Sequence, residues 1–397
     1  MRDQLDRDYR VLAELAAGAR RWLLDEAAPL WSQAGWSDKG LFAERLLLNG
    51  QPDPSPRRVF VQARHIYSFT QIGRFGWKGP WSELVNASLD YLLTHARRSD
   101  GFFVHSFTHN GIVHDGRADL YDQAFMMFCF AHAGKALGRP ELFDVAAEIA
   151  SKLDGEWKKR SGGYYEGEIV DPTIRLQNPH MHLFEAYSAL AEATGDAAWE
   201  SRAREIAELC RDRFVDRSTG AIIEYFDNNL SPLQEDKGKI VEPGHCCEWA
   251  WLFEGMAQQN WSDSIQLSNQ LVDFARSHGI DRRRNVMINE VLLDGRVHNN
   301  AARLWPQTER LKAALARLRR TGETTEVLEA VDAYNGLSQY LNVEISGLWR
   351  DKLREDGSWV EEPAPGSSLY HITCAYVELI GSVETLALRN SVAFKTA

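Results

Sequence analysis

The stretch DLYDQAFMMFCFAHAGKAL (119–137) is apolar on nearly every face when it is drawn as a helix. A helix that is hydrophobic all round is buried on more than one side. Two further stretches share this character, MHLFEAYSALAEAT (181–194) and CEWAWLFEGMAQ (247–258). The three stretches predict inner helices that other parts of the chain cover.

More polar segments alternate with these inner helices. WSELVNASLDYLLTH (81–95), ELFDVAAEIASKL (141–153) and AAWESRAREIAELCRDRF (197–214) have helical spacing of apolar residues on one face. Each runs into a glycine followed by an apolar pair, and the same device returns near the end of the chain: DGFF (100–103), SGGYY (161–165), TGAII (219–223) and DGSW (356–359). Glycine ends a helix or forms a turn, and the apolar pair suits a short strand.

Polar residues near the starts of the apolar helices define a repeat. They recur every 58 to 64 residues, at Arg64, Asp122, His182, His245, Glu309 and His371. Repeats of this length are typical of stacked or closed helical arrays. We therefore predict an all-α fold, an (α/α)6 barrel of six helix hairpins with short strands at the turns, forming one catalytic domain over residues 1–397. The six polar residues differ in type, which favours a single site built from six walls.

Two segments interrupt the pattern. Residues 49–58 (NGQPDPSPRR) are expected to form a loop that feeds the first inner helix, and the charged segment 277–300 to form a lid or hairpin. Neither is the Pro/Gly/Ser-rich linker that would divide the chain into domains.

Composition excludes several classes of function. The net charge is −11, from 45 basic and 56 acidic residues, which disfavours nucleic acids and anionic membranes as partners. No stretch approaches the roughly 18 uncharged apolar residues of a membrane helix. The segment MRDQLDRDYRVLAELAAGARRWLL (1–24) carries charges throughout, unlike a signal peptide. Five cysteines without CxxC spacing argue against a disulfide framework. We expect a soluble cytoplasmic protein.

Histidines are the candidate catalytic groups. His245 and His371 fall on the fourth and sixth walls, so both rings could reach one small substrate and act as base and acid. Glu248 lies three residues after His245 and would either orient its imidazole or form an ordinary surface pair. No HExxH motif is present, and His180 and His182 do not share a helix face, so we expect no metal.

Three other features point to a small polar ligand. Arg64, the one cation among the six wall positions, would anchor an oxyanion or a sugar hydroxyl, or else pair with Asp122 or Glu309. Trp305 precedes a proline at a helix entry and is the best candidate for a platform under a sugar ring. No phosphate-binding glycine loop is present, so no nucleotide cofactor is expected.

Five motifs in order carry a resemblance over about residues 20–390: QAR (62–64), NPHMHLFEA (178–186), GHCCEW (244–249), LWPQTE (304–309) and YH (370–371). Together they resemble the N-acylglucosamine 2-epimerase family. The resemblance implies an (α/α)6 barrel that isomerises or epimerises sugars without metal or redox cofactor. It implies the catalytic pair His245 and His371. The substrate-binding set is then Arg64, Tyr121, Asn178, His182, Glu248, Trp305 and Glu309, and the role of His180 stays open.

Within the family, the segments EPGHCCEWAWLF and SSLYHITCAY look closest to the mannose isomerases. We therefore expect interconversion of D-mannose and D-fructose, with D-lyxose and D-xylulose as further substrates, through a cis-enediolate. His371 is expected to be the base at C2 with His245 as its partner, although the two could be swapped. No surplus of Arg or Lys appears in the motifs, so we expect a neutral monosaccharide substrate and a monomer or homodimer.

Other readings stay open. Return of the proton to C2 from the other face would give a 2-epimerase of the mannose/glucose, cellobiose or N-acylglucosamine type. A glycoside hydrolase on the same fold would use two carboxylates, drawn from Asp122, Glu248 and Glu309. A non-catalytic sugar- or protein-binding member is a further possibility, because fold does not determine function.

Overall fold

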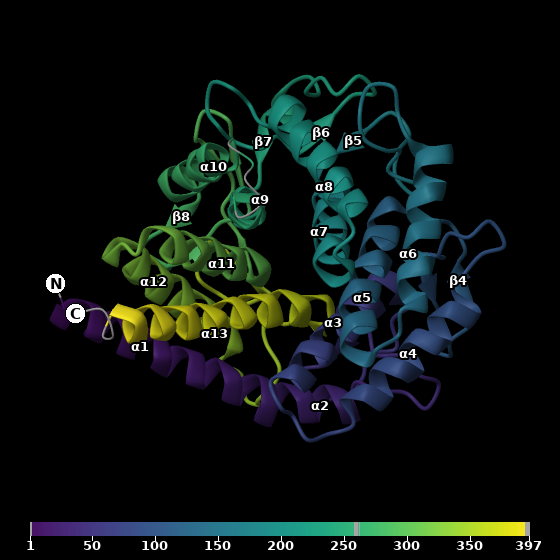
Figure 1. The fold of residues 1–397 in the computed structure, drawn as a ribbon, viewed down its shortest axis with the longest axis horizontal. Coiled ribbons are helices and arrows are strands. Elements are labelled where there is room, and N and C mark those ends of the chain that lie inside the picture. The colour runs from purple at the N-terminus through teal and green to yellow at the C-terminus, as the bar shows by residue number, and fades with distance from the viewer. Residues whose placement is uncertain (1, 258–260, 262, 394–397) are drawn as a thin grey trace.

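Six helices form a closed inner ring in the computed structural model, which describes residues 2–257, 261 and 263–393 (Figure 1). They are α3 (Val59–Arg74), α5 (Leu120–Leu137), α7 (Gln177–Thr194), α9 (Pro243–Ala257), α11 (Leu304–Thr321) and α13 (Ser367–Ala393). Each packs against its neighbours in this order, and α13 packs against α3 to close the ring. Every one of the three predicted inner stretches lies in this ring, except that Gln258 is outside the described residues.

A second layer of helices covers the ring. It consists of α4 (Trp81–His95), α6 (Glu141–Lys152), α8 (Ala197–Leu209), α10 (Ser264–His278), α12 (Thr324–Leu341) and α1 (Arg2–Arg21). The first five each pack on the inner helix that precedes them, whereas α1, from the start of the chain, covers α13 (Figure 1). The predicted (α/α)6 barrel is therefore confirmed, with its sixth pair made from the two ends of the sequence. None of the described helices is both long and apolar enough to cross a bilayer.

Short helical segments extend the outer layer. Three π-helical turns continue α1, α6 and α8, and two brief helices lie in connections: η1 (Trp22–Ala27), η2 (Leu153–Trp157), η3 (Cys210–Phe214), α2 (Ala28–Gln33) and the 3-10 turn η4 (Asp236–Lys239).

Connections differ sharply between the two ends of the barrel. An inner helix passes to the next outer helix by a tight turn, as at Gly138, Gly195 and Gly322, where φ is +67°, +70° and +69°. Glycine adopts this left-handed conformation without steric cost and so ends these helices. The return from outer to inner helix is long and carries all the strands. These long connections gather at the end where the inner helices begin, here called the mouth.

The strands of the mouth are short and pair antiparallel. They are β1 (Arg45–Leu46), β2 (Arg57–Arg58), β3 (Ser106–Phe107), β4 (Val113–Asp115), β5 (Arg175–Leu176), β6 (Tyr225–Phe226), β7 (Ile240–Val241), β8 (Ile280–Asp281), β9 (Val286–Met287), β10 (Glu290–Leu292), β11 (Val297–Asn299), β12 (Ala302–Arg303), β13 (Lys352–Leu353) and β14 (Ala364–Pro365). Pairs such as β1–β14, β2–β3 and β5–β6 join one repeat to the next. They tie the connections into a continuous frame above the ring.

The four predicted glycine turns are present, but the apolar pairs after them form less strand structure than predicted. The four glycine devices form single antiparallel bridges rather than ladders, at Arg97–Phe103, Lys158–Tyr164, Val215–Ile222 and Leu353–Trp359. The segment 277–300 forms the hairpins β8–β9 and β10–β11, in agreement with the hairpin prediction. The loop 49–58 runs into α3 as predicted, although its last two residues form β2.

One hydrogen-bonding device recurs where the inner helices meet these connections. A glutamine near the helix start binds both the N–H and the C=O of the residue twenty positions earlier: Gln62 with Phe42 (2.8 and 3.1 Å), Gln123 with Phe103 (2.8 and 3.0 Å) and Gln307 with Met287 (2.7 and 2.8 Å). We call each of these a glutamine staple. In α7 His180 has a related role, accepting from Tyr164 N at 2.9 Å and bonding Leu176 O at 2.9 Å.

The staples correct the alignment of the repeats. Two residues along a helix face roughly opposite directions, because a turn takes about 3.6 residues. The residue two positions after a staple therefore points toward the barrel axis, which makes Phe125, not Asp122, the counterpart of Arg64. The Arg64 guanidinium lies 4.3 Å from the centre of the Phe125 ring. Asp122 instead accepts from Phe60 N at 3.0 Å and binds His105 Nδ1 at 2.7 Å.

Replacing a staple should destabilise the barrel. Gln123→Ala leaves the buried N–H and C=O of Phe103 without their partner, and we expect a loss of about 2–4 kcal/mol in the free energy of unfolding. Urea unfolding followed by circular dichroism measures the loss. Gln266→Ala on the exposed face of α10 is the matched control and should cost less than about 0.5 kcal/mol. Equal stabilities of the two variants would contradict the structural role of the staple.

Candidate active site

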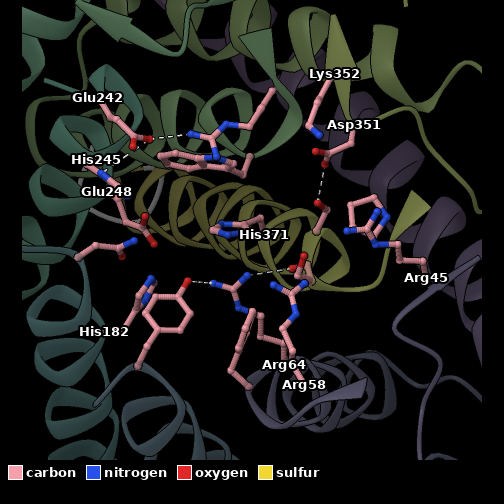
Figure 2. Close-up of a pocket in the computed structure, with 18 of the residues that line it drawn as sticks. Arg45, Arg58, Arg64, His182, Glu242, His245, Glu248, Asp351, Lys352 and His371 are labelled. Carbon is pink, nitrogen blue, oxygen red and sulfur yellow. Dashed lines mark hydrogen bonds and ion pairs between the residues drawn. The ribbon is translucent and has the colours of Figure 1, made fainter. Parts of the chain in front are cut away.

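A cavity of about 410 Å³ opens at the mouth, within the size range of small-molecule sites (Figure 2). All six inner helices contribute to its wall, and residues of β1, β2, β12 and β13 line its entrance. The convergence of the helix starts on one site, expected from the repeat, is therefore present.

Eight of the nine site residues predicted from the sequence line this cavity: Arg64, Tyr121, Asn178, His182, His245, Glu248, Trp305 and His371. The ninth, Glu309, is fully buried behind His371 and does not line it. His180 is also fully buried and is occupied by the backbone bonds described above, so it contributes to the fold.

Each of the three cavity histidines is held by a carboxylate. The Nδ1 contacts are His182 to Glu185 at 3.1 Å, His245 to Glu224 at 3.0 Å and His371 to Glu309 at 2.9 Å. A carboxylate oxygen accepts, so Nδ1 carries the proton in each pair and Nε2 remains for a ligand. The three rings are thereby fixed in both tautomer and orientation.

The partner of His245 differs from the predicted one. Glu248 was expected to orient this imidazole, but Glu224 does so from the connection just before β6, and Gln177 Nε2 in turn donates to Glu224 at 2.8 Å. Glu224 has no helical spacing to His245, and the available signal was its place after the apolar pair of a glycine turn. Glu185, by contrast, lies three residues after His182 inside the NPHMHLFEA motif.

His245 carries a positive charge at neutral pH. Burial lowers the pKa of His245, but the carboxylates of Glu224 and Glu242 outweigh burial and raise it to about 9. Glu242 Oε2 lies 4.0 Å from Nδ1 of the same ring. At pH 7 the Nε2 of this histidine is a proton donor.

His371 is in the opposite state. Burial lowers its pKa well below the ordinary value, and the charges of Arg64 and Lys312 add to that shift. With Nδ1–H directed to Glu309, the Nε2 of neutral His371 is a proton acceptor. The cavity thus presents a proton donor on α9 and a proton acceptor on α13.

Below the two histidines lies a buried charge cluster that the sequence analysis missed. Lys312 Nζ is 2.6 Å from Glu309 Oε2, 4.0 Å from Glu248 Oε1 and 3.9 Å from the centre of the Trp251 ring. Burial lowers the pKa of Lys312, but the two carboxylates raise it above its ordinary value. Glu248 lies farther from the Lys312 ammonium than Glu309 does. Burial together with the Glu309 charge raises the pKa of Glu248 to about 8. Glu248 therefore offers the cavity a protonated carboxyl at pH 7.

Arg64 has no carboxylate partner among the described residues, so the predicted alternative of a salt bridge to Asp122 or Glu309 is wrong. Its Nη2 donates to the Tyr121 hydroxyl at 2.7 Å and its Nη1 to Ser367 O at 3.4 Å. Aromatic rings surround the guanidinium, including Tyr370 with its centre 4.8 Å away. A buried cation of this kind is suited to stabilise negative charge on a ligand.

Two further residues, Trp305 and Asn178, line the cavity beside these groups. The Trp305 ring lies 4.8 Å from the ring of His245 and 5.8 Å from that of His371, centre to centre, and so forms a wall between the two. Asn178 Oδ1 is buried without a hydrogen-bond partner although its residue lines the cavity. An aromatic wall and a free amide oxygen suit a ligand with an apolar face and hydroxyl groups.

Among the described residues, three groups at or behind the cavity wall have the composition of a metal site: His182–Glu185–Glu248, Glu224–Glu242–His245 and Glu248–Glu309–His371, with ligand atoms within 4.8 Å of one another. In each group the histidine Nδ1 already binds one of the carboxylates. A metal at Nδ1 would have to displace that hydrogen bond. Metal independence remains a prediction.

The chain is similar to known proteins over most of its length. The family model described as N-acylglucosamine 2-epimerase (GlcNAc 2-epimerase) matches residues 40–375. A mannose-6-phosphate isomerase of Rhizobium meliloti (strain 1021) is 39% identical, over 90% of this chain and 95% of that protein. A cellobiose 2-epimerase of Bacteroides fragilis (strain ATCC 25285) is 22% identical, over 78% of this chain and 84% of that one.

A solved structure of a D-mannose isomerase has the same fold. It superposes with a TM-score of 0.83 at 19% identity, covering 90% of this chain and 96% of its own. At this identity the likeness concerns the fold alone.

The protonation of Glu248 can be tested without a substrate. We expect an infrared band of a protonated carboxyl at pH 7 that disappears on titration near pH 8, because burial and Glu309 favour the neutral form. The part of the band that titrates near pH 8 should be absent in Glu248→Gln and retained in Glu254→Gln, which removes a carboxylate paired with Arg320 instead. A band that Glu248→Gln leaves unchanged would contradict the assignment.

Proposed function

Because the chain belongs to the N-acylglucosamine 2-epimerase family, we propose that it is an aldose–ketose isomerase that interconverts D-mannose and D-fructose, with D-lyxose and D-xylulose as further substrates. The observation that carries the proposal is the pair His245 and His371, which face one cavity from two walls in opposite protonation states. The proposal treats residues 1–397 as one catalytic domain that needs no metal or cofactor.

The cavity can perform each step of such a reaction. In the open-chain sugar, neutral His371 removes the proton from C2 while protonated His245 donates a proton to the carbonyl oxygen at C1. The product is a cis-enediol, and Arg64 and the protonated carboxyl of Glu248 stabilise the enediolate charge that develops on the way to it. Return of the proton from His371 to C1, with transfer of the O2 proton to the now neutral His245, gives the ketose and restores both histidines.

Positioning residues support these two catalytic groups. Glu309 holds the Nδ1 of His371 and Glu224 holds that of His245, so each Nε2 faces the substrate. Trp305 and Asn178 would orient the sugar, and the Nε2 of His182, which is kept neutral because burial lowers its pKa to about 4, would accept a hydrogen bond from a hydroxyl.

A 2-epimerase is the second candidate. His245 lies on a different wall from His371 and is protonated, so it could return a proton to C2 from the opposite face. Relatives named as isomerases favour the first candidate, because the Rhizobium meliloti protein is more similar to this chain than the cellobiose 2-epimerase is. Hydrolysis is disfavoured, since of the three carboxylates considered for it, Glu248 alone lines the cavity.

Incubation with D-mannose in D₂O containing EDTA tests the reaction. We expect fructose that carries deuterium, formed at an undiminished rate in the chelator. His371→Ala and His245→Ala should each reduce kcat by about 10²–10⁴-fold, the usual contribution of a general acid or base. His109→Ala, at an exposed position, is the control. Glucose as the first product would favour the epimerase, and full activity of His371→Ala would exclude the mechanism.

The pH dependence of kcat/KM should be bell-shaped. Activity needs protonated His245, so it is lost as the pH rises through about 9, and it needs neutral His371, so the acidic limb lies well below pH 6.5. Glu248 ionises near pH 8 and contributes to the alkaline limb. In Glu248→Gln that limb should move toward 9. Activity that keeps rising above pH 9 in the wild type would contradict the role of His245.

A further inference from the structure

The entrance of the cavity holds more positive charge than the sequence analysis anticipated. Five basic side chains line it: Arg45, Arg58, Arg64, Arg303 and Lys352. Four carboxyl groups line the same cavity, those of Glu242, Glu248, Asp351 and Glu362. Four of the five basic residues lie outside the inner-helix motifs, in the connections of the mouth, which is why the motifs did not reveal them.

These cations differ in how firmly they are already paired. Arg303 binds Glu242 at 2.8 Å, and Lys352 binds Glu362 at 3.1 Å. The Lys352 side chain is 46% exposed, so that ion pair is weak and easily exchanged.

The two arginines at the entrance, Arg45 and Arg58, retain free donors. Arg58 uses Nε and Nη2 on Glu44, which leaves Nη1 available. Arg45 has no carboxylate partner among the described residues, and its Nε is buried without a hydrogen bond. A buried guanidinium nitrogen without an acceptor carries a desolvation cost that an anionic ligand would remove.

Three of the cations are grouped on one side of the cavity, where Asp351 also lies. In Figure 2, Arg45, Arg58 and Lys352 lie on one side of His371, whereas His182, His245 and Glu248 lie on the other. Arg45 belongs to β1, Arg58 to β2 and Lys352 to β13, so the frame of short strands positions all three. A sugar whose C1 and C2 lie between His245 and His371 would direct its other end toward these strands.

We propose that Arg45, Arg58 and Lys352 bind a phosphate group on the sugar carbon farthest from C1, so that the physiological substrate is a hexose 6-phosphate. This inference rests on the isomerase function proposed above. A phosphate monoester carries nearly two negative charges and three acceptor oxygens, which suits two guanidinium groups and an ammonium. Glu362 would give up Lys352 to the phosphate, and the Asp351 carboxylate already accepts a hydrogen bond from Ser368 Oγ at 2.8 Å.

The test compares D-mannose, D-mannose 6-phosphate and D-mannose 6-sulfate as substrates. We expect kcat/KM to be highest for the phosphate. In Arg45→Ala and in Lys352→Ala the ratio of kcat/KM for the phosphate to that for mannose should fall about 10- to 100-fold, the effect of losing one charged hydrogen bond. Arg296→Ala, at an exposed arginine of a mouth hairpin that pairs with Asp294, should leave the ratio unchanged.

The outcomes separate this inference from the proposed function. Turnover of mannose without preference for the phosphate, or a ratio insensitive to Arg45→Ala, overturns the phosphate site and leaves the isomerase intact. Equal preference for the sulfate ester overturns the choice of phosphate. If neither sugar is isomerised, calorimetric binding of mannose 6-phosphate that Arg45→Ala weakens supports the site while the isomerase fails. Absence of binding as well overturns both.

Discussion

The hydrogen bonds that fasten the inner helices to the mouth constrain both the fold and the site. Gln62 and Gln307 each bind a backbone N–H and C=O twenty residues earlier, and so set how far each helix is rotated about its axis. Two residues later come Arg64 and Glu309, which consequently face the barrel axis. In α7 the same relation links His180 to His182. A small rotation of α3, α5, α7 or α11 would therefore break buried backbone hydrogen bonds before it displaced a site residue.

Once the rotation is set, the chemistry depends on which charges surround two similar imidazoles. His245 and His371 each donate Nδ1–H to a carboxylate at nearly the same distance. The second neighbours differ: Glu242 stands beside His245, whereas Arg64 and Lys312 act on His371. Buried charges cost free energy unless they are compensated, and the compensation here makes one ring an acid and the other a base.

The inner ring and most of the cavity could be predicted because they depend on helix periodicity, which is local in sequence. Arg64, His182 and His371 needed only a repeat length and a helix face. Asp122 was aligned with Arg64 although Phe125, about one turn later, is the true counterpart. The connections between helices differ in length, so the repeat length alone does not fix the position. A polar side chain at a helix start can also face a loop, as Asp122 does. Glu224 could not be found this way, because its role arises from a contact between distant segments. Lys312 has helical spacing to Glu309, but its proximity to Glu248 arises only when α9 packs on α11.

The cavity residues are divided between the inner helices and the connections of the mouth, and this division bears on which substrate is bound. Groups that would act at C1 and C2 belong to the inner helices, whose positions the ring constrains on both sides. Arg45, Arg58 and Lys352 belong to two-residue strands at the mouth, where loops tolerate substitution more readily than packed helices do. Relatives with one reaction centre can therefore acquire different substrates by changing the strands alone. For this chain, the charge at the mouth is accordingly better evidence of the substrate than the histidines, which relatives acting on different sugars can share.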